Sequence, residues 1–419
     1  MILIRRSEVG GTIRAPPSKS YTHRAILMGF LTAGPFRVRN PLLSEDTQAT
    51  IDGVEAFGGR CTVGNGELVV RGEGLALPEK AVDARNSGTT LRLLTGLAAL
   101  LDGTTRLTGD ASLRRRPMGP LLDALRDLGV SCSVAEDGCP PVEVAGPMKG
   151  TRAKLRGDVS SQFLSSLLIA CPLKATETRI DVLPPVRSEP YVDLTIHMLR
   201  EFGVAVDRLE GGYRIPGGRT YAGTSFTVPG DFSSAAFPLA AGAVAGGPVT
   251  VEGLDASRPQ GDVRFLDLLR AFGATVDVRG DRVTVSGGTL LGRSIDVSQN
   301  PDLFPILAVL GACARGTTRL SGGEHLRFKE SDRIATTVAF LRTMGAEIEA
   351  TPDGCVVRGP ATLRGARIVT EGDHRIAMAA AVAALAAEGV TNIEDEGSHA
   401  VSYPTFLDDL RSLGAKVVV

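Results

Sequence analysis

The first chemically distinctive stretch of the sequence is "PPSKSYTHRA" near the N-terminus, where Lys19 and Arg24 flank the start of a predicted helix. The two prolines favour an extended entry, Ser18 or Ser20 is a typical N-cap, and the following apolar run predicts a helix from about residue 21 to residue 32. A helix N-terminus already carries partial positive charge, so added cations are unfavourable there unless an anion binds. The spacing therefore indicates an anion site, although a capped helix with two solvated cations gives the same pattern.

Polar residues followed by an apolar run recur at other predicted helix starts along the chain. The stretches are "NSGTTLRLL", "RRRPMGPLL", "GDVSSQFLSSLL", "SQNPDLFPILAVL", "RFKESDRIATTV" and "GDHRIAMAAAV". Within them, Asn86 is expected to cap its helix and Pro117 to occupy the first helical position. Each stretch alone also fits an ordinary capped helix or a solvated charged face. Together they indicate a site for an anion with several phosphate and carboxylate groups, with carboxylates available for proton transfer.

A repeat of about 70 residues must position these helix starts. An amphipathic helix that ends in a glycine recurs six times, and a strand follows each glycine. The glycines are Gly58, Gly129, Gly203, Gly273, Gly345 and Gly414. With a second helix before each of these, the repeat is β-α-β-α-β-β. We therefore expect an α/β fold of two similar domains with three repeats each, 14–225 and 1–13 plus 226–419, with the N-terminal strand pairing in the second domain.

Composition excludes several classes of protein. The 419 residues have a formal net charge of −1, which argues against a general nucleic-acid or membrane-surface binder. The six cysteines are scattered, the five histidines are not clustered, and the N-terminal stretch has no signal-peptide pattern. Nucleotide-binding, hydrolase and zinc motifs such as G-x-x-x-x-G-K, G-x-S-x-G and H-E-x-x-H do not occur. From these features we expect a soluble cytoplasmic protein that binds neither metal, nucleic acid nor membrane.

Taken together, the motifs resemble the 5-enolpyruvylshikimate-3-phosphate synthase family. "PPSKSYTHRA", "NSGTTLRLL", "RRRPMGPL", "GDVSSQFLSSLL", "SEPYVDLT", "RFKESDR" and "GDHRIAMA" occur in the family's order over nearly the whole chain. The resemblance implies a transferase of the shikimate pathway to aromatic amino acids, expected to be a monomer that uses neither metal nor organic cofactor. It would move the enolpyruvyl group of phosphoenolpyruvate to the 5-hydroxyl of shikimate 3-phosphate, through a non-covalent tetrahedral intermediate, with both ligands bound between the domains.

The resemblance also implies roles for individual residues. The expected ligands of shikimate 3-phosphate are Lys19, Ser20, Arg24, Ser160, Ser161, Gln162, Ser188, Tyr191, Asp302 and Lys329. The expected ligands of phosphoenolpyruvate are Lys19, Gly88, Arg116, Gln162, Arg333 and Arg375. Asp302 and Glu330, assisted by Lys19, would transfer protons, and the sequence does not assign the two carboxylates to particular steps. Gly88 is expected to leave room for phosphonate analogues of phosphoenolpyruvate, which would make the enzyme a target of glyphosate.

Two positions depart from the family pattern, and two other functions stay open. Val401 stands where bacterial relatives commonly have lysine, and His325 where many have asparagine. One alternative is the enolpyruvyl transferase that acts on UDP-N-acetylglucosamine; that family has a Lys-Asn start and a reactive loop cysteine, whereas this chain has Lys19-Ser20 and no cysteine between Cys61 and Cys132. The other is a non-catalytic repeat scaffold, which would not need carboxylates among so many cations.

Overall fold

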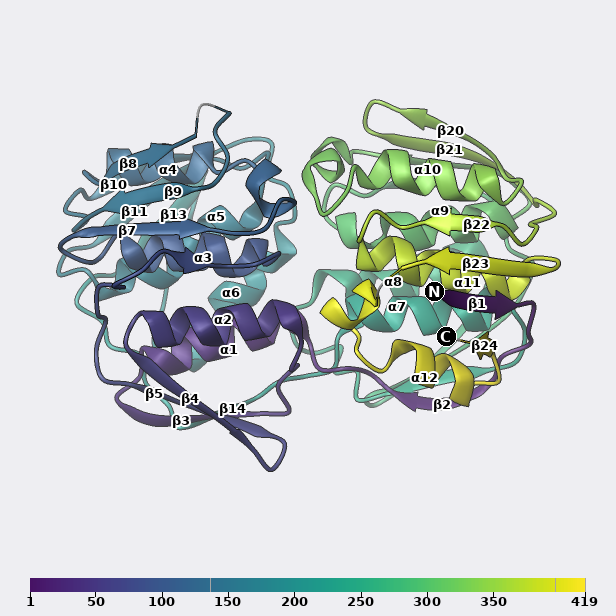
Figure 1. Ribbon diagram of the computed structural model, residues 1–419, viewed down its shortest axis with the longest axis horizontal. Coiled ribbons are helices and arrows are strands. Elements are labelled where there is room, and N and C mark those ends of the chain that lie inside the picture. Colours follow the sequence, from purple (N-terminus) through teal and green to yellow (C-terminus); the bar gives the residue numbers. More distant parts are fainter. Residues whose placement is uncertain (136, 396, 419) are drawn as a thin grey trace. The chain divides into compact units, whose positions relative to one another are not determined.

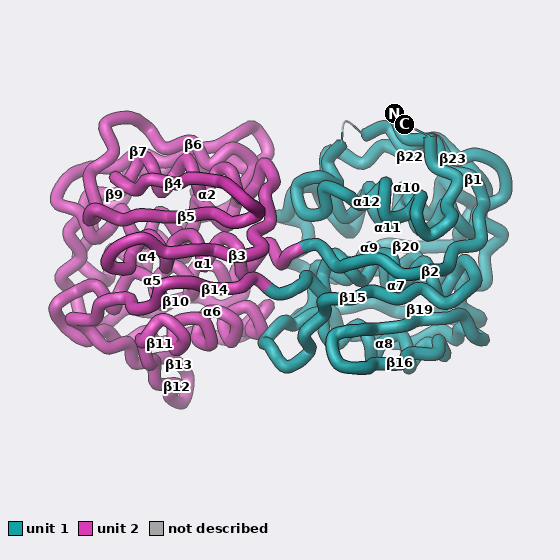
Figure 2. Tube along the Cα trace, turned by 90° about the horizontal axis from the view of Figure 1, so that it is seen from below, with its two compact units in different colours: residues 1–16, 229–419 teal, residues 17–228 magenta. Residues whose placement is uncertain are grey.

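The computed structural model describes residues 1–135, 137–395 and 397–418. The chain divides into two compact units: unit 1 contains residues 1–16 and 229–419, and unit 2 contains residues 17–228 (Figure 2). The divisions lie three residues after those expected from the sequence. Among the residues described, every helix is too short or too polar to cross a bilayer.

Among the described residues, each unit contains three four-stranded sheets, and each sheet combines one parallel pair of strands with antiparallel neighbours (Figure 1). In unit 2, the strands of the first sheet lie in the spatial order β14 (Ser225–Thr227), β3 (Gly34–Arg39), β5 (Glu67–Gly72) and β4 (Gly59–Gly64). The second sheet has the order β6 (Val82–Asp83), β7 (Thr104–Thr108), β9 (Val142–Ala145) and β8 (Ser131–Val134). The third has the order β10 (Arg152–Arg156), β11 (Thr178–Leu183), β13 (Gly212–Ile215) and β12 (Asp207–Leu209). In unit 1, one sheet has the order β16 (Thr275–Arg279), β17 (Arg282–Ser286), β15 (Val249–Glu252) and β2 (Gly11–Arg14). Another has the order β18 (Ser294–Asp296), β19 (Gly316–Ser321), β21 (Gly354–Gly359) and β20 (Glu347–Thr351). The remaining described sheet has the order β22 (Arg367–Val369), β23 (Val390–Glu394), β1 (Ile2–Arg5) and β24 (Lys416–Val418).

Two kinds of helix alternate along the chain. The first helix of each repeat is buried over nearly its whole length, and these helices are α1 (Lys19–Phe30), α3 (Gly88–Ala98), α5 (Ser161–Ala170), α7 (Phe232–Val244), α9 (Phe304–Cys313) and α11 (His374–Ala386). The second helices are α2 (Glu45–Ala56), α4 (Gly119–Asp127), α6 (Pro190–Glu201), α8 (Phe265–Phe272), α10 (Arg333–Thr343) and α12 (Phe406–Ser412). In unit 1, α7, α9 and α11 pack against one another (Figure 1). A helix that is apolar on all sides must lie inside the unit, so only its ends can carry polar chemistry.

Short 3-10 helices precede or follow several of these elements. They are η1 (Leu113–Arg115), η2 (Cys171–Leu173), η3 (Gly261–Arg264), η4 (Pro301–Leu303), η5 (Glu324–Phe328) and η6 (Ser398–Val401). Five of them, η1, η3, η4, η5 and η6, lie shortly before a helix of the repeat, where the chain turns into its first residues. They therefore help to shape the helix starts singled out by the sequence.

The predicted β-α-β-α-β-β repeat is confirmed, with one exchange of strands. Strand β2 precedes α1 in the chain but pairs in parallel with β15 of unit 1, whereas β14 precedes α7 and pairs with β3 of unit 2. The N-terminal strand β1 lies between β23 and β24, where Ile4 is opposite Thr391 and Val417. The expectation that the N-terminal strand pairs in the second domain is thus confirmed.

All six glycines that define the repeat lie just after a second helix and have positive φ, between 81° and 105°. Residues with a Cβ rarely adopt this conformation, so glycine allows each helix to end and the chain to turn into the next strand. Two local expectations were wrong. Helix α1 runs two residues earlier than predicted, with Ser18 as an N-cap whose side chain makes no capping bond. Pro117 precedes α4, which instead has Pro120 in its first turn.

Candidate active site

The predicted site residues lie at or near helix starts in both units. Unit 2 contains Lys19, Ser20, Arg24, Gly88, Arg116, Ser160, Ser161, Gln162, Ser188 and Tyr191, and unit 1 contains Asp302, Lys329, Glu330, Arg333 and Arg375. Within each unit, the structure brings several of them together across long sequence separations.

At the start of α1, Lys19 and Arg24 have different environments. The Lys19 ammonium pairs with Asp46 of α2, with 2.7 Å between Nζ and Oδ2. Arg24 is 1 % exposed, and its guanidinium donates to neutral oxygens: Thr195 Oγ1 at 2.8 Å, the Ser20 carbonyl at 2.9 Å and Ser165 Oγ at 3.2 Å. Burial lowers the pKa of Arg24 to about 10. A buried cation held by neutral acceptors favours the binding of an anion.

At the start of α3, two arginines converge on Gly88. A Cβ atom at this position would lie 3.3 Å from Nη1 of Arg116 and 3.3 Å from Nη1 of Arg92. Arg92 donates to Gln162 Oε1 at 2.6 Å, and Gln162 donates to Thr89 Oγ1 at 2.8 Å. We call Gly88, Arg92, Arg116 and Gln162 the Gly88 group. Its two guanidinium groups and a helix N-terminus are a favourable combination for a phosphate.

The cap of α3 differs from the prediction. Ser87, rather than Asn86, is the N-cap, and its Oγ accepts a hydrogen bond of 3.1 Å from the Thr90 N–H. Asn86 instead accepts from Nη2 of Arg116 at 2.9 Å. Arg92 is not among the ligands expected from the sequence, but its guanidinium lies beside Gly88 and is therefore included in the candidate site.

The remaining predicted residues of unit 2 surround the starts of α5 and α6. Ser160 caps α5 by accepting from the Gln162 N–H at 3.3 Å, and Ser161 is the buried first residue of that helix. Ser188 has φ of +55°, a conformation that costs a residue with a side chain on the order of 1 kcal/mol. Tyr191 lies in the first turn of α6, one helical turn before Thr195, which binds Arg24. These hydroxyl groups are neutral hydrogen-bond donors beside buried cations.

In unit 1, arginines and carboxylates form a compact network, the arginine–carboxylate cluster, which consists of Asp302, Glu330, Arg333, Asp373 and Arg375. Arg333 donates from Nη1 to Asp302 at 3.0 Å, from Nη2 to Glu330 at 2.5 Å, and from Nε to Asp373 at 2.9 Å. Arg375 donates from Nη2 to the other oxygen of Asp302 at 2.9 Å. Asp302 is therefore held by two arginines, one on each oxygen.

The charges in this cluster have strong effects on ionisation. Burial opposes the charged form of Asp302, but the nearby cations, Arg375 first and then Arg333 and Lys329, hold the pKa of this carboxyl well below its ordinary value. Burial also disfavours the Arg333 cation, but Asp373 and the other two carboxylates raise the pKa of Arg333 above its ordinary value. Asp302 and Arg333 are thus both ionised at neutral pH.

Sequence reasoning missed several residues that shape these groups. Asp46 pairs with Lys19, and Asp373 caps α11 while it accepts from Arg333. Asp262 is buried, accepts from Ser233 Oγ at 2.5 Å, and has its pKa raised to about 6 by burial and by the charge of Asp302. The available signal for Asp373 was its place before Arg375 at a helix start. For Asp46 and Asp262 the sequence offered only an acidic residue beside an amphipathic helix.

The two positions that depart from the family pattern lie in 3-10 helices. His325 is buried within η5, and Val401 is the half-buried last residue of η6.

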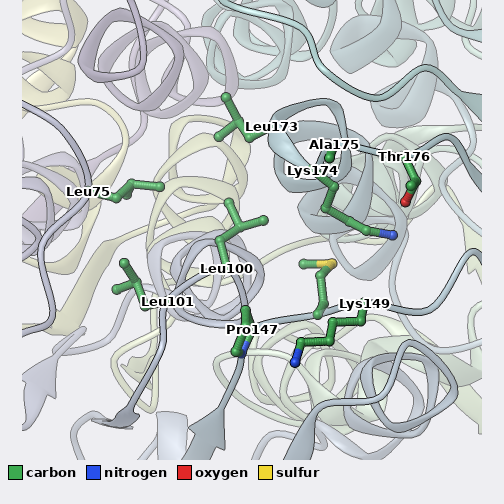
Figure 3. A pocket seen from close by; sticks show the side chains of 10 residues that line it. Leu75, Leu100, Leu101, Pro147, Lys149, Leu173, Lys174, Ala175 and Thr176 are labelled. Carbon is green, nitrogen blue, oxygen red and sulfur yellow. The ribbon is translucent and has the colours of Figure 1, made fainter.

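Unit 2 also contains a cavity of about 550 Å³, and Figure 3 shows the residues that line it. Leu100 and Leu101, which follow the C-terminal end of α3, and Leu173 and Lys174, which follow α5, contribute to its wall. Lys174 donates to the Gly150 carbonyl oxygen and to Thr178 Oγ1. The predicted site residues are at the opposite ends of these helices, so the cavity is separate from the candidate site.

Comparison with known proteins gives a consistent result. The family model for EPSP synthase (3-phosphoshikimate 1-carboxyvinyltransferase) matches residues 4–410. The 3-phosphoshikimate 1-carboxyvinyltransferases of Methanocorpusculum labreanum and Halobacterium salinarum are 49% and 48% identical to this chain, over 99% and 98% of its length and 98% and 97% of their own.

Solved structures agree with these sequence comparisons. An EPSP synthase from Acinetobacter baumannii has a TM-score of 0.81 at 30% identity and covers 100% of this chain and 99% of its own. The enolpyruvyl transferase NikO from Streptomyces tendae, at 20% identity, shares the fold with a TM-score of 0.80, covering 100% of this chain and 98% of its own. The chain therefore belongs to the EPSP synthase (3-phosphoshikimate 1-carboxyvinyltransferase) family.

Proposed function

We propose that this protein transfers the enolpyruvyl group of phosphoenolpyruvate to the 5-hydroxyl of shikimate 3-phosphate and releases phosphate. The observation that carries the proposal is the convergence of Arg92 and Arg116 on Gly88, because it creates a phosphate site at a helix start where a side chain would intrude. Family membership supplies the substrate pair. The enzyme would act in the shikimate pathway as a cytoplasmic monomer.

Shikimate 3-phosphate would bind mainly to residues of unit 2. Arg24 supplies a buried positive charge, and the hydroxyl groups at the starts of α5 and α6 supply donors for the phosphate and the ring. The proposed ligands are Lys19, Ser20, Arg24, Ser160, Ser161, Gln162, Ser188 and Tyr191, with Asp302 and Lys329 of unit 1 contacting ring hydroxyls. Neutral donors beside a buried cation suit a phosphate because each bond to a charged oxygen is stronger than one between neutral groups.

Phosphoenolpyruvate has two anionic ends, and two groups of residues suit them. The Gly88 group and Lys19 would bind the phosphate, and Arg333 and Arg375 would bind the carboxylate. Because Arg333 already donates to three carboxylates, a substrate carboxylate would replace Asp302 or Glu330 on its outer nitrogens. The displaced side chain would lose part of its stabilisation as an anion and so become a better proton acceptor when substrate is bound.

The reaction needs three proton movements. The 5-hydroxyl loses a proton as its oxygen attacks C2 of phosphoenolpyruvate, and C3 gains a proton to give a tetrahedral intermediate. The bond from C2 to the phosphate oxygen then breaks while C3 loses a proton, which restores the double bond. We propose that Asp302 and Glu330 accept and return these protons, assisted by Lys19, and that a coupled pair can share the steps.

Phosphate release tests this function directly. Purified protein is given phosphoenolpyruvate with shikimate 3-phosphate and, in a parallel assay, with UDP-N-acetylglucosamine. We expect release only with shikimate 3-phosphate. Release only with UDP-N-acetylglucosamine would replace the proposal by the other enolpyruvyl transferase reaction, and release with neither substrate by folded protein would support a non-catalytic anion-binding protein.

A further inference from the structure

A line of buried polar side chains connects Lys19 with the start of α3. Lys19 Nζ is 2.7 Å from Asp46 Oδ2, and the other oxygen of Asp46 faces Nε2 of His23 at 3.6 Å. His23 is buried, and its Nδ1 lies 2.6 Å from Thr50 Oγ1. Thr50 Oγ1 in turn lies 2.6 Å from Thr90 Oγ1. The residues come from α1, α2 and α3, which pack as neighbours in unit 2 (Figure 1).

The line ends at Ser87, the N-cap next to Gly88. Ser87 Oγ lies 2.7 Å from Thr90 Oγ1 and also accepts from the Thr90 N–H at 3.1 Å. The helix starts that carry Lys19 and the Gly88 group are therefore joined by contacts between side chains. We call the residues Asp46, His23, Thr50, Thr90 and Ser87 the buried relay.

A single choice of tautomer fixes every hydrogen in the buried relay. Nε2 of His23 faces a carboxylate oxygen, so this nitrogen must carry the hydrogen, and Nδ1 must then accept. Thr50 must donate its one hydroxyl hydrogen to Nδ1, so Thr90 must donate to Thr50, and Ser87 must donate to Thr90. The hydroxyl hydrogens of the buried relay therefore all point toward His23. Asp46 accepts from Lys19 on Oδ2, and its Oδ1 faces the Nε2–H of His23 at 3.6 Å, an electrostatic contact that is longer than a hydrogen bond.

The charges around His23 support this arrangement. Burial lowers the pKa of His23, Asp46 raises it in part, and the Lys19 and Arg24 cations lower it further, so the imidazole is neutral at physiological pH. Burial opposes ionisation of Asp46, but Lys19 and then His23 hold the pKa of Asp46 well below its ordinary value. An ionised Asp46 thus faces one full cation and one neutral N–H donor.

We propose that Asp46 and His23 are positioning residues that hold the Lys19 ammonium in place for enolpyruvyl transfer. The inference rests on the proposed function, because it assigns Asp46 and His23 a role through Lys19. Asp46 supplies the counter-charge, and His23, oriented by Thr50, keeps Asp46 turned toward Lys19. A lysine side chain has many rotamers, so a fixed carboxylate lowers the entropy lost when the ammonium meets substrate.

A double-mutant cycle tests whether Asp46 acts through Lys19. We expect Asp46→Asn to lower kcat/KM for phosphoenolpyruvate at least tenfold and to move the basic limb of the pH–rate profile to lower pH. In Lys19→Met protein, the same Asp46→Asn change should cause less than a twofold further loss, because the group it positions is already absent. Multiplicative losses in the double variant would overturn the proposal.

A matched control comes from the same helix. Asp52, also on α2, pairs with Arg85 but lies outside the buried relay. Asp52→Asn should leave kcat/KM within twofold of wild type. Wild-type phosphate release is measured first, so absence of turnover in wild type would overturn the proposed function, whereas normal turnover in Asp46→Asn would overturn only this inference.

The role of His23 has a readout that is independent of activity. Long-range ¹H–¹⁵N spectra of the full chain, assigned with His23→Gln, should show His23 as the neutral Nε2–H tautomer. Thr50→Val removes the donor to Nδ1 and should change this signal, whereas Thr95→Val, which removes a bond to the Leu91 carbonyl, should not. A protonated imidazole or the Nδ1–H tautomer in wild type would overturn the assignment of the relay.

Discussion

A methyl group at position 88 would touch the two guanidinium groups that define the proposed phosphate site. The Cβ of Gly88→Ala would lie 3.3 Å from nitrogens of Arg92 and Arg116, so both must move by a few tenths of an ångström. We expect KM for phosphoenolpyruvate to rise about 5- to 30-fold, with KM for shikimate 3-phosphate within threefold of wild type. Inhibition by a phosphonate analogue such as glyphosate should weaken by at least the same factor, because a loss of 1–2 kcal/mol of anion binding affects both ligands.

Gly119→Ala is the control for this prediction. Gly119 is also the first residue of a helix, α4, but nothing lies within 4 Å of a Cβ built there. Steady-state kinetics of both variants separate a local steric effect from a general effect of alanine at a helix start. Unchanged inhibition in Gly88→Ala protein would show that the space at this position is not used by the analogue.

The buried carboxyl of Asp262 should make the protein less stable as pH rises. Burial and the neighbouring charge of Asp302 raise the pKa of Asp262 to about 6 in the folded state, above the ordinary value of about 4 in an unfolded chain. Between pH 4 and pH 6 the Asp262 carboxyl keeps its proton in the folded state but loses it in the unfolded chain. The free energy of unfolding therefore falls as the pH rises through this range, and it stays reduced by the full amount above pH 6. We expect Asp262→Asn to remove a cost of up to ~3 kcal/mol.

Thermal unfolding at two pH values measures this effect. The difference in Tm between Asp262→Asn and wild type should be several degrees more favourable to the variant at pH 7.5 than at pH 4.5. The exposed carboxylate of Asp267 on α8 provides a control, since Asp267→Asn should give the same small difference at both pH values. A gain for Asp262→Asn that is independent of pH would contradict the raised pKa.

At the scale of the elements, the glycines that end the second helices should differ in their tolerance of alanine. Gly273 and Gly345 have φ of 105° and 94°, so alanine at either costs ~1–2 kcal/mol from backbone conformation alone. At Gly345 the nearest atom to a new Cβ is the Thr362 carbonyl oxygen at 3.5 Å, an ordinary contact. At Gly273 the Cβ would overlap the Thr289 carbonyl oxygen. We therefore expect Gly273→Ala to lower the denaturant midpoint of unfolding clearly more than Gly345→Ala.

These two variants control for each other because both positions end a second helix in unit 1. Equal midpoints would mean that the backbone near Thr289 moves aside at little cost. A larger effect of Gly345→Ala would show that local conformation, rather than the close approach, determines the loss of stability.

Helix ends were predictable from sequence to different degrees. The C-terminal glycines were found because φ above zero strongly selects glycine, so residue type reports conformation. The caps were less certain because Ser18, Ser20, Asn86 and Ser87 are all good capping residues, and only backbone geometry decides which side chain reaches an N–H. Pro117 was misplaced for a related reason, because both it and Pro120 can begin a helix.

At the scale of the whole molecule, the sequence predicted the repeat. It predicted only part of the exchange of strands between the two units, namely that the N-terminal strand pairs in the second domain. Strand β14 has only three residues, too few to show the alternation of apolar and polar residues that is typical of a strand. Its pairing with β3 also joins residues nearly 190 positions apart, so no local pattern predicts it. The residues of the candidate site show the same difference between local and long-range features. Cations at helix starts could be recognised locally, whereas Asp46, which pairs with Lys19, and the buried Asp262 lie on other segments and reach the candidate site only through packing.

Binding of one substrate alone should distinguish the contributions of the two units. Ser161 in unit 2 is a proposed shikimate 3-phosphate ligand, and a lost hydrogen bond to a charged phosphate costs ~1.5–3 kcal/mol, so Ser161→Ala should weaken binding roughly tenfold or more. Glu330 in unit 1 is proposed for proton transfer, and Glu330→Gln keeps its shape and an acceptor for Arg333. Calorimetry without phosphoenolpyruvate should therefore give a Kd for Glu330→Gln within twofold of wild type, although its kcat falls at least 100-fold, in the range typical of a lost acid–base group. If Glu330→Gln instead weakens binding as much as Ser161→Ala, then Glu330 contacts shikimate 3-phosphate itself, and Asp302 becomes the proposed proton acceptor.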